Sequence, residues 1–289
     1  MHKSITAVLL LLCSVTALAN SPKIVAHRGG TADAPENTIY AIDQALKNGA
    51  DKIWITVQLS SDKVPILYRP SDLNTLTNRS GPVSSYRAQQ LMKADAGYRF
   101  GSRHNHLYCN KGIVIPTLKQ VLQQFRATDF YIDLKSPDAD PYEQAQAIEK
   151  VLKEEKAFRR TRFYSTNEAF LNALSEHVQR FESRDETRDI LANITMNHHC
   201  LIDKRINTQR WYELELRRKV EVVEKYTLGE ARSSSDLVWD HEAMKCFRAS
   251  GGAHIVLFGI KDEADYQLAK ELGADEVMVD SPKYFKNIK

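Results

Sequence analysis

The chain has 289 residues, of which 43% are hydrophobic and 27% charged, and a formal net charge of +3 at pH 7. This is the composition of an ordinary globular protein, and the length suits one large α/β domain as well as two small ones. A net charge this small excludes a general attraction to nucleic acid, so any anion binding must be local.

The first nineteen residues have the pattern of a signal peptide. Lys3 is followed by a short apolar stretch, and Ala17-Leu18-Ala19 has the small residues of a cleavage site. The stretch is too short to span a membrane comfortably, and no later apolar run approaches membrane length. We therefore expect an exported protein, periplasmic or secreted after cleavage near Ala19, with residues 20–289 as a single domain and no stable membrane span.

The rest of the chain alternates between β-rich and helical runs. Strands are predicted at residues 23–27, 52–59, 64–68, 130–135, 162–165, 237–240, 254–260 and 276–280. Helices are predicted at residues 37–49, 116–125, 141–158, 167–178, 211–226, 240–252 and 262–273. Eight strands followed by helices in this length predict a TIM (β/α)8 barrel, with a doubly wound open sheet as the alternative. The charged residues at 182–186 are expected to form a solvated loop.

A short sequence motif that occurs near both ends of the chain supports a closed, repetitive barrel. Residues 45–55 and 269–279 share the order helix, Gly-Ala-Asp turn, strand. Gly49 and Gly273 stand where glycine commonly ends a helix. Each turn is therefore expected to deliver its strand from the same side of the sheet.

Residues 69–114 break the alternation and predict a long loop inserted after the third strand, at the face where barrel active sites form. The segments "HNHLYC" (104–109) and "NHHC" (197–200) have a soft-metal composition, but their spacings match no metal motif. A disulfide surrounded by solvated histidines, including His198 and His199, is the alternative. Cys246 is expected in the core, and Cys109–Cys200 is the candidate bridge in an oxidising compartment.

The first strand ends in residues suited to a phosphate. His27 and Arg28 follow its apolar run, and two glycines then allow the backbone to approach a ligand closely. Arginine offers a planar fork to phosphate oxygens, whereas histidine can transfer a proton near neutral pH. Glu36 and Asn37 open the next helix, where they either cap it or contribute to the site.

This opening resembles that of the glycerophosphodiester phosphodiesterases. The resemblance runs through "AHRGG" (26–30), "APENTIYAIDQALKNGAD" (34–51), "VQLSSDKVPIL" (57–67), "IPTLKQVL" (115–122), "IDLKSP" (132–137) and "GADEVMVDSP" (273–282). It implies a TIM barrel that cleaves glycerophosphodiesters with a divalent metal, two histidines as acid and base, and an arginine on the phosphate. By this resemblance His27 is a catalytic histidine, Arg28 the phosphate ligand and Glu36 a residue near the metal.

Several positions depart from the family pattern. Trp54 and Thr56 stand where the family has a Glu-x-Asp pair that faces the metal. Arg69 stands where the family has its second histidine. Asp133 replaces the usual glutamate of the fourth barrel strand, while the family's lysine is kept as Lys135.

These departures favour an anion over a metal. Ca²⁺ takes roughly six to eight oxygen ligands and Mg²⁺ demands a nearly octahedral set, yet Glu36 and Asp133 are the carboxylates that remain. A divalent Ca or Mg ion would therefore have an incomplete site. The substitutions also add positive charge, so we predict that Arg69, Lys135 and Asn37 join Arg28 in binding substrate.

Three functions follow. In the first, the chain is an exported, degenerate family member, a pseudoenzyme of lipid metabolism, that binds a small phosphate-bearing ligand such as a glycerophosphodiester. In the second, it is an active phosphoric diester hydrolase in which His27 acts and arginine replaces the metal, as in the similar barrels of bacterial phosphatidylinositol phospholipases. His104 or His106 would then supply the missing histidine. In the third, a non-catalytic barrel binds a partner protein through its loops.

Overall fold

The structure is a computed structural model that describes residues 20–101, 107–203, 208–249 and 251–289. The predicted signal peptide, His104 and His106 lie outside these residues. Within the described ranges, no helix combines the length and the apolar character needed to cross a bilayer.

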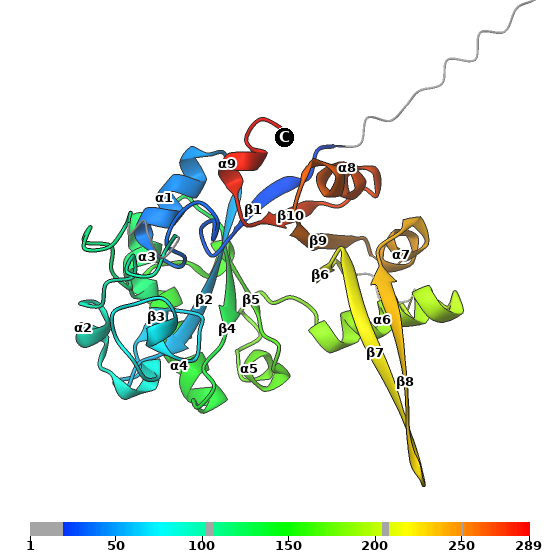
Figure 1. The fold of residues 1–289 in the computed structure, drawn as a ribbon, viewed down its shortest axis with the longest axis horizontal. Coiled ribbons are helices and arrows are strands. Elements are labelled where there is room, and N and C mark those ends of the chain that lie inside the picture. Colours follow the sequence, from blue (N-terminus) through cyan, green and yellow to red (C-terminus); the bar gives the residue numbers. More distant parts are fainter. Residues whose placement is uncertain (1–19, 102–106, 204–207, 250) are drawn as a thin grey trace, which may run out of the picture.

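A cylindrical parallel sheet forms the centre of the molecule (Figure 1). Its strands, in hydrogen-bonded order, are β5 (Thr161–Tyr164), β4 (Phe130–Leu134), β2 (Lys52–Leu59), β1 (Lys23–His27), β10 (Glu276–Val279), β9 (Ala253–Ile260) and β6 (Arg210–Glu215). Residues 179–182 join the two ends, because Phe163 pairs in parallel with Arg180 and the Glu182 N–H donates to the Trp211 carbonyl at 2.8 Å. Together with this segment the strands close a TIM barrel, as predicted.

Helices surround the barrel (Figure 1). They are α1 (Ile39–Lys47), α2 (Ala88–Leu91), α3 (Leu118–Gln124), α4 (Pro141–Glu154), α5 (Glu168–Asn172), α6 (Arg184–Asn197), α7 (His241–Phe247), α8 (Glu263–Glu271) and α9 (Pro282–Phe285). Short polar side chains cap their first turns: Thr38, Thr117 and Asp140 each accept a hydrogen bond from a backbone N–H of the helix that follows. These caps fix where each crossover helix begins.

Side chains of the barrel strands alternate between two apolar cores, as the period of two requires. The inward set fills the barrel and comprises Val25, Trp54, Tyr131, Tyr164, Phe181, Val256, Phe258 and Met278. The outward set, such as Ile53 and Ile132, packs in the larger core that also contains helix residues such as Ile42 and Ile148. Trp54 therefore lies inside the barrel, where its ring is 3% exposed.

The two similar segments, residues 45–55 and 269–279, also have the same local structure. Gly49 and Gly273 both adopt left-handed φ values, +85° and +73°, directly after the ends of α1 and α8. The carboxylates of Asp51 and Asp275 then each accept a hydrogen bond of 2.8 Å from a backbone N–H of a neighbouring strand. The same turn chemistry thus delivers β2 and β10 into the sheet.

Residues 64–68 do not form the third barrel strand that we predicted. Their strand, β3 (Pro65–Leu67), runs antiparallel to β2 and lies off the barrel path. The segment 69–114 that follows contains two short 3₁₀ helices, η1 (Leu73–Thr75) and η2 (Val83–Ser85), as well as α2. This segment packs around a small apolar core of its own.

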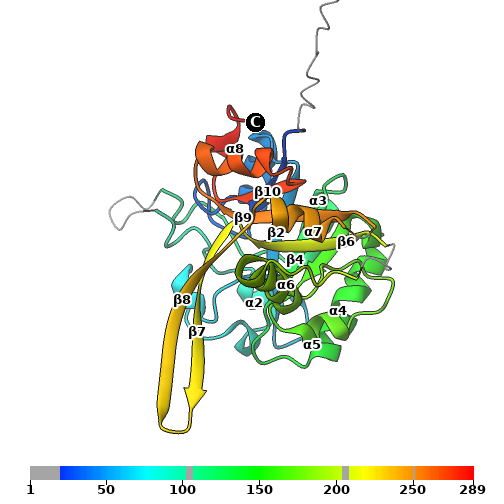
Figure 2. The same cartoon turned by 90° about the vertical axis from the view of Figure 1, so that its right-hand side faces the viewer.

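The predicted helix at residues 211–226 is wrong. These residues form β6 and then β7 (Arg217–Tyr226), which pairs with β8 (Gly229–Val238) as a hairpin that projects from the barrel (Figures 1 and 2). The valines at 220, 222 and 223 are β-branched and favour a strand, but the alternating charges between them also fit a helix surface. The predicted strand at 237–240 is the end of this hairpin and not a barrel strand.

Two further predictions need correction. Residues 184–197 form α6 after the N-cap Ser183, so the charged segment at 182–186 is largely helical.

Cys200 is bonded to Cys246, with their Cα atoms 5.6 Å apart, whereas Cys109 is a free thiol. The reason is that α6 packs against α7, which carries Cys246. The disulfide removes Cys200 as a metal ligand, and the neighbouring His198 pairs with a glutamate on α7.

Candidate functional site

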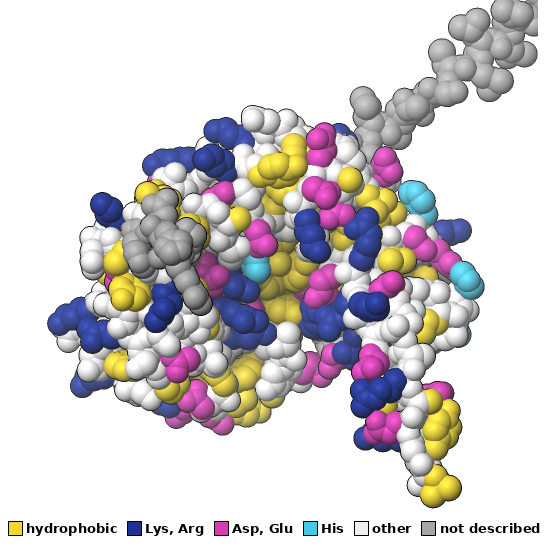
Figure 3. Space-filling view, viewed as in Figure 1, with side chains coloured by type: hydrophobic (Ala, Val, Ile, Leu, Met, Phe, Trp, Pro, Cys, Tyr) yellow, Lys and Arg dark blue, Asp and Glu magenta, His cyan; other side chains and the backbone are white. Residues whose placement is uncertain are grey.

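A cavity of about 700 Å³ opens at the carboxyl ends of the barrel strands. Figure 3 shows it as a hollow with a hydrophobic floor and Lys and Arg side chains on both sides. The carboxyl ends of parallel strands meet at one rim, which explains why distant segments contribute. Five of the predicted site residues line it: His27, Arg28, Arg69, Asp133 and Lys135.

His27 is held at the rim by a carboxylate at the end of the last strand. Its Nδ1 lies 2.6 Å from Oδ1 of Asp280, which also accepts a hydrogen bond of 2.7 Å from the Thr31 hydroxyl. The hydrogen bond from His27 lowers the pKa of Asp280, and the Thr31 hydroxyl adds to this effect. Because Nδ1 is used, Nε2 is the ring nitrogen left for a ligand.

Sequence reasoning missed the role of Asp280. The available signal was its position directly after β10, since His27 ends β1 and the two strands are neighbours in the sheet. Adjacent parallel strands place their last residues side by side. A carboxylate and a histidine at those two positions predict a pair.

Arg28 is oriented by Glu36. Its Nη1 donates to both carboxylate oxygens at 3.0 Å, and its backbone is left-handed with φ +52°. The Nε–H of Arg28 is buried without a partner among the described residues. Glu36 therefore acts on Arg28 and does not cap α1, whose N-cap is Thr38.

Asn37 lies behind the cavity wall. Its Oδ1 accepts a hydrogen bond of 2.9 Å from the backbone N–H of Thr56, which ties α1 to β2, and its side chain is 2% exposed. The structure does not include Asn37 among the residues that line the cavity. Its observed contact is thus with the barrel framework.

Arg69 and Lys135 bring further positive charge to this side of the cavity. The Arg69 guanidinium makes no hydrogen bond or ion pair with any other described residue. Lys135 Nζ donates to the Thr166 hydroxyl at 2.7 Å and lies 3.7 Å from Asp133 Oδ1. Burial raises the pKa of Asp133 to about 6, although the neighbouring cations, Lys135 first, oppose that rise. We call His27, Arg28, Arg69 and Lys135 the anion wall.

The residues present do not fit the divalent metal that the resemblance implies. The inward positions 54 and 56 of β2 carry Trp54 and Thr56, which offer an indole and one hydroxyl. Both oxygens of Glu36 are used by Arg28, and Asp133 is paired with a lysine. In the part of the chain that the structure describes, no three His, Cys, Asp or Glu side chains are arranged to hold a metal ion.

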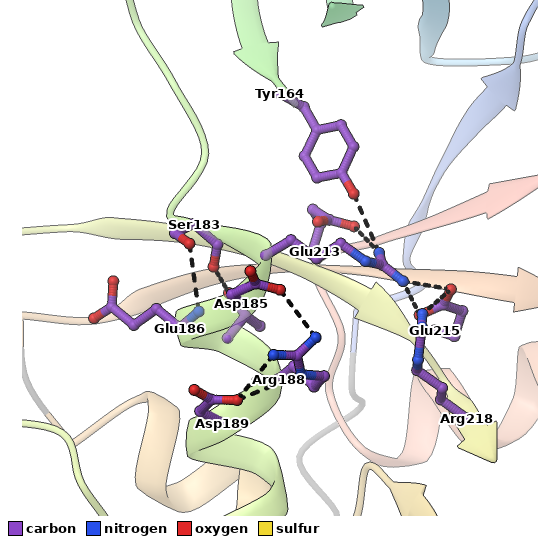
Figure 4. Close-up of polar contacts among 11 residues, drawn as sticks. Tyr164, Ser183, Asp185, Glu186, Arg188, Asp189, Glu213, Glu215 and Arg218 are labelled. Atoms are coloured by element: carbon purple, nitrogen blue, oxygen red, sulfur yellow. Dashed lines mark hydrogen bonds and ion pairs between the residues drawn. The ribbon is translucent and has the colours of Figure 1, made fainter. Parts of the chain in front are cut away.

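The opposite side of the cavity is a network of ion pairs (Figure 4). Arg184 Nη2 donates to both oxygens of Glu215 at 2.7 and 2.9 Å, and its Nη1 donates to the Tyr164 hydroxyl at 3.2 Å. Arg218 shares the same carboxylate at 3.1 and 3.3 Å. Beneath them Glu213 is fully buried, which raises its pKa well above the usual value, although Arg184 opposes this. We call Arg184, Glu215 and Arg218 the paired wall.

Arg184 was not predicted as a cavity residue. Its place in the charged segment at 182–186 suggested solvent exposure, but its side chain is only 14% exposed because β6 presents Glu213 and Glu215 to it. Alternation of Glu213 and Glu215 along the sequence was the available signal for two inward carboxylates. It was hidden by the helical interpretation of residues 211–226.

Comparisons with known proteins agree with this geometry. The model of a family described as the glycerophosphoryl diester phosphodiesterase family matches residues 27–284. An uncharacterized protein of Mycobacterium tuberculosis, Rv2277c, is 42% identical over 269 residues, which cover 91% of this chain and 88% of that protein.

Solved structures show the same similarity. The crystal structure of the glycerophosphoryl diester phosphodiesterase domain of Rv2277c superposes with a TM-score of 0.85 at 40% identity, covering 93% of this chain and 99% of that one. A phosphodiesterase of Oleispira antarctica, solved in complex with the product sn-glycerol-3-phosphate, superposes with a TM-score of 0.66 at 21% identity and covers 93% and 96% of the two chains. The second likeness is one of fold.

Proposed function

Because this chain belongs to the glycerophosphoryl diester phosphodiesterase family, we propose that it binds the phosphate of a glycerophosphodiester at the anion wall and hydrolyses it slowly without a divalent metal. The observation that carries the proposal is that Arg69, which lines the cavity with His27 and Arg28, has no hydrogen-bond or ion-pair partner among the described residues, while the carboxylates described there do not fit a metal. The solved complex of the Oleispira antarctica phosphodiesterase with sn-glycerol-3-phosphate supports a glycerol phosphate as ligand class.

In this proposal the guanidinium groups supply the positive charge that a metal supplies elsewhere. Within the described ranges, the buried Nε–H of Arg28 has no partner, and the guanidinium of Arg69 makes no hydrogen bond or ion pair. Both are donors suited to phosphate oxygens, and they stabilise the negative charge that grows on those oxygens as the ester bond breaks.

His27 is the acid–base group. Its Nδ1 is bonded to the Asp280 carboxylate, which fixes the ring and stabilises the imidazolium formed when Nε2 takes a proton. Hydrolysis needs two proton transfers: one from the attacking water, as its oxygen bonds to phosphorus, and one to the alcohol oxygen, as its bond to phosphorus breaks. Nε2 can serve as the acceptor in the first or as the donor in the second. Because Arg69 stands where the family has its second histidine, one of these two proton transfers lacks a protein partner, and the rate is low.

Hydrolysis of glycerophosphoglycerol in EDTA tests this proposal. We expect slow turnover that EDTA leaves unchanged and that His27→Ala reduces by about 10²–10⁴-fold, the contribution of a positioned acid–base group. Turnover that EDTA abolishes would show that other ligands hold a metal. The matched control is His254→Ala, which removes a histidine from the opposite end of the barrel, where it pairs with Glu276.

A second candidate function is binding without turnover, and Arg69 is the observation that favours it. An arginine cannot act as a base because its guanidinium stays protonated. If only binding is retained, wild type binds glycerol phosphate, and its hydrolysis of glycerophosphodiesters stays at background in both EDTA and Mg²⁺.

We also propose export, on the strength of the signal-peptide pattern in residues 1–19. Expression of the full chain in a bacterial host should yield a protein outside the cytoplasm whose mass corresponds to a start after Ala19. Recovery of the intact chain from the cytoplasm would contradict it.

A further inference from the structure

The cavity has a third surface, which is apolar. Trp54 from β2, Phe258 and Ile260 from β9, and Met278 from β10 line it. We call these four residues the apolar wall. Figure 3 shows hydrophobic side chains on the floor of the hollow, between the basic groups. A phosphate gains nothing from such a surface, so a ligand that contacts it must do so with another of its groups.

The apolar wall is rigid before any ligand binds. Three of its residues, Trp54, Phe258 and Met278, belong to the inward core of the barrel. The Trp54 and Phe258 rings pack edge to face, with their centroids 5.1 Å apart. Each is at most 8% exposed, so its conformation is set by packing. Next to them Gly259 is exposed with φ +72°, and nothing lies within 4 Å of the position that a Cβ would take. The glycine keeps this side of the cavity open.

The cavity is also larger than a phosphate needs. About 700 Å³ lies within the range of pockets that enclose drug-sized ligands. With the phosphate on the anion wall, the remaining volume borders the apolar wall. The second ester group of a phosphodiester is therefore expected to occupy it.

The charges around the cavity disfavour a cationic ester group. Its lining contains four basic side chains besides the paired arginines: Arg28, Arg69, Lys135 and Lys261. Three carboxylates line the cavity, and each already lies beside a cation: Glu215 binds two arginines, Asp280 binds His27, and Asp133 Oδ1 lies 3.7 Å from Lys135 Nζ. An ammonium group such as that of choline would thus meet mostly like charges, because each carboxylate of the lining already has a cation beside it.

We propose that the ligand is a phosphodiester with an uncharged apolar ester group, such as an alkyl chain, which lies on the apolar wall while the phosphate lies on the anion wall. The inference rests on the proposed function for the phosphate and adds the identity of the group attached to it. Trp54 is the central residue, because it places an indole where the family resemblance has a metal-binding carboxylate.

Calorimetry with a matched series of ligands tests this inference. Glycerol 3-phosphate and its methyl, butyl, hexyl and choline esters are titrated into the wild-type protein in EDTA. We expect affinity to rise with chain length by at most about fourfold for each buried methylene group, and the choline ester to bind more weakly than the butyl ester. Met278→Gln, of similar size but polar, should flatten the rise in affinity with chain length.

The outcomes separate this inference from the proposed function. If all the esters bind equally and Arg69→Ala weakens them all, the phosphate site is correct and the apolar ester group is wrong. If the choline ester binds most tightly, the inference is also overturned. If no ester binds, both proposals fail. If Met278→Gln does not fold, the affinities of the ester series for the wild type alone decide whether the inference holds. Leu228→Asn, at the fully exposed tip of the hairpin, is the control for a polar substitution away from the cavity.

Discussion

The anion wall and the paired wall face the same cavity with the same kinds of side chain, but their charges are used differently. On the paired wall Glu215 forms ion pairs with both arginines, and Arg184 makes further contacts to Tyr164 and Glu213. On the anion wall Arg69 has no described partner. Arg28 on the anion wall is also oriented by a carboxylate, Glu36, so the difference between the walls lies in Arg69, whose guanidinium has no carboxylate partner among the described residues and is available to a ligand.

The largest expected effect comes from the hydrogen-bonded pair formed by His27 of the anion wall and Asp280. Asp280→Asn removes the charge that stabilises a protonated His27 and should lower the hydrolysis rate by about 10²–10⁴-fold. The change should appear in kcat more than in KM, because the phosphate contacts remain. Thr31→Ala, which removes only the second hydrogen bond to Asp280, is the control and should change the rate little.

Removal of one arginine from each wall separates structure from binding. Arg184→Ala leaves Glu213 and Glu215 without their main cation and should lower the free energy of unfolding by about 2–4 kcal/mol, less than a fully buried pair because Glu215 is partly exposed. Arg69→Ala should change it by less than about 0.5 kcal/mol. Urea unfolding measures both. Equal losses would mean that Arg69 also has a structural partner.

Binding should show the reverse order. Arg69→Ala should weaken binding of glycerol 3-phosphate by about 1.5–3 kcal/mol, the value of a hydrogen bond to a charged group. Arg28→Ala should weaken it by a similar amount, but it also leaves Glu36 unpaired and so lowers stability. An unchanged affinity in both variants would remove the phosphate from the anion wall.

The pH dependence of stability gives the smallest effect. Burial raises the pKa of Glu213 in the folded protein, so the wild type loses stability relative to Glu213→Gln as pH rises above the unfolded value of about 4.3. Glu215 is the matched control with the opposite sign. Burial by itself raises the pKa of Glu215, but Arg184 lowers it below the value in the unfolded chain. The wild type therefore loses stability relative to Glu215→Gln as the pH falls below that unfolded value. Thermal unfolding of both variants at pH 4, 6 and 8 measures the difference.

The barrel and the anion wall were largely predictable because their signals are local. Once parallel strands are inferred, the ends of those strands place His27, Arg28 and Lys135 at one rim of the barrel. The repeated Gly-Ala-Asp motif identifies two equivalent turns. Arg69 was predicted for the cavity through the family resemblance, although its strand proved to be antiparallel and outside the barrel.

The paired wall could not be predicted because it depends on long-range packing. The segment 179–182 is too short to have a strand pattern, yet it closes the barrel. Residues 211–226 fit both a helix and two strands until β9 provides a partner for β6. Without that strand, neither Glu215 nor its contact with Arg184 can be inferred. The Cys200–Cys246 bridge likewise depends on two helices that meet only in the fold.

The most direct test of the account is whether phosphate binding depends on metal or on Arg69. Glycerol 3-phosphate is titrated into wild type and Arg69→Ala, each in EDTA and then in millimolar Ca²⁺ or Mg²⁺. We expect wild type to bind equally in all three buffers and Arg69→Ala to bind more weakly in each. Binding by wild type that appears only with metal, and that Arg69→Ala retains in full, would contradict a metal-independent anion wall.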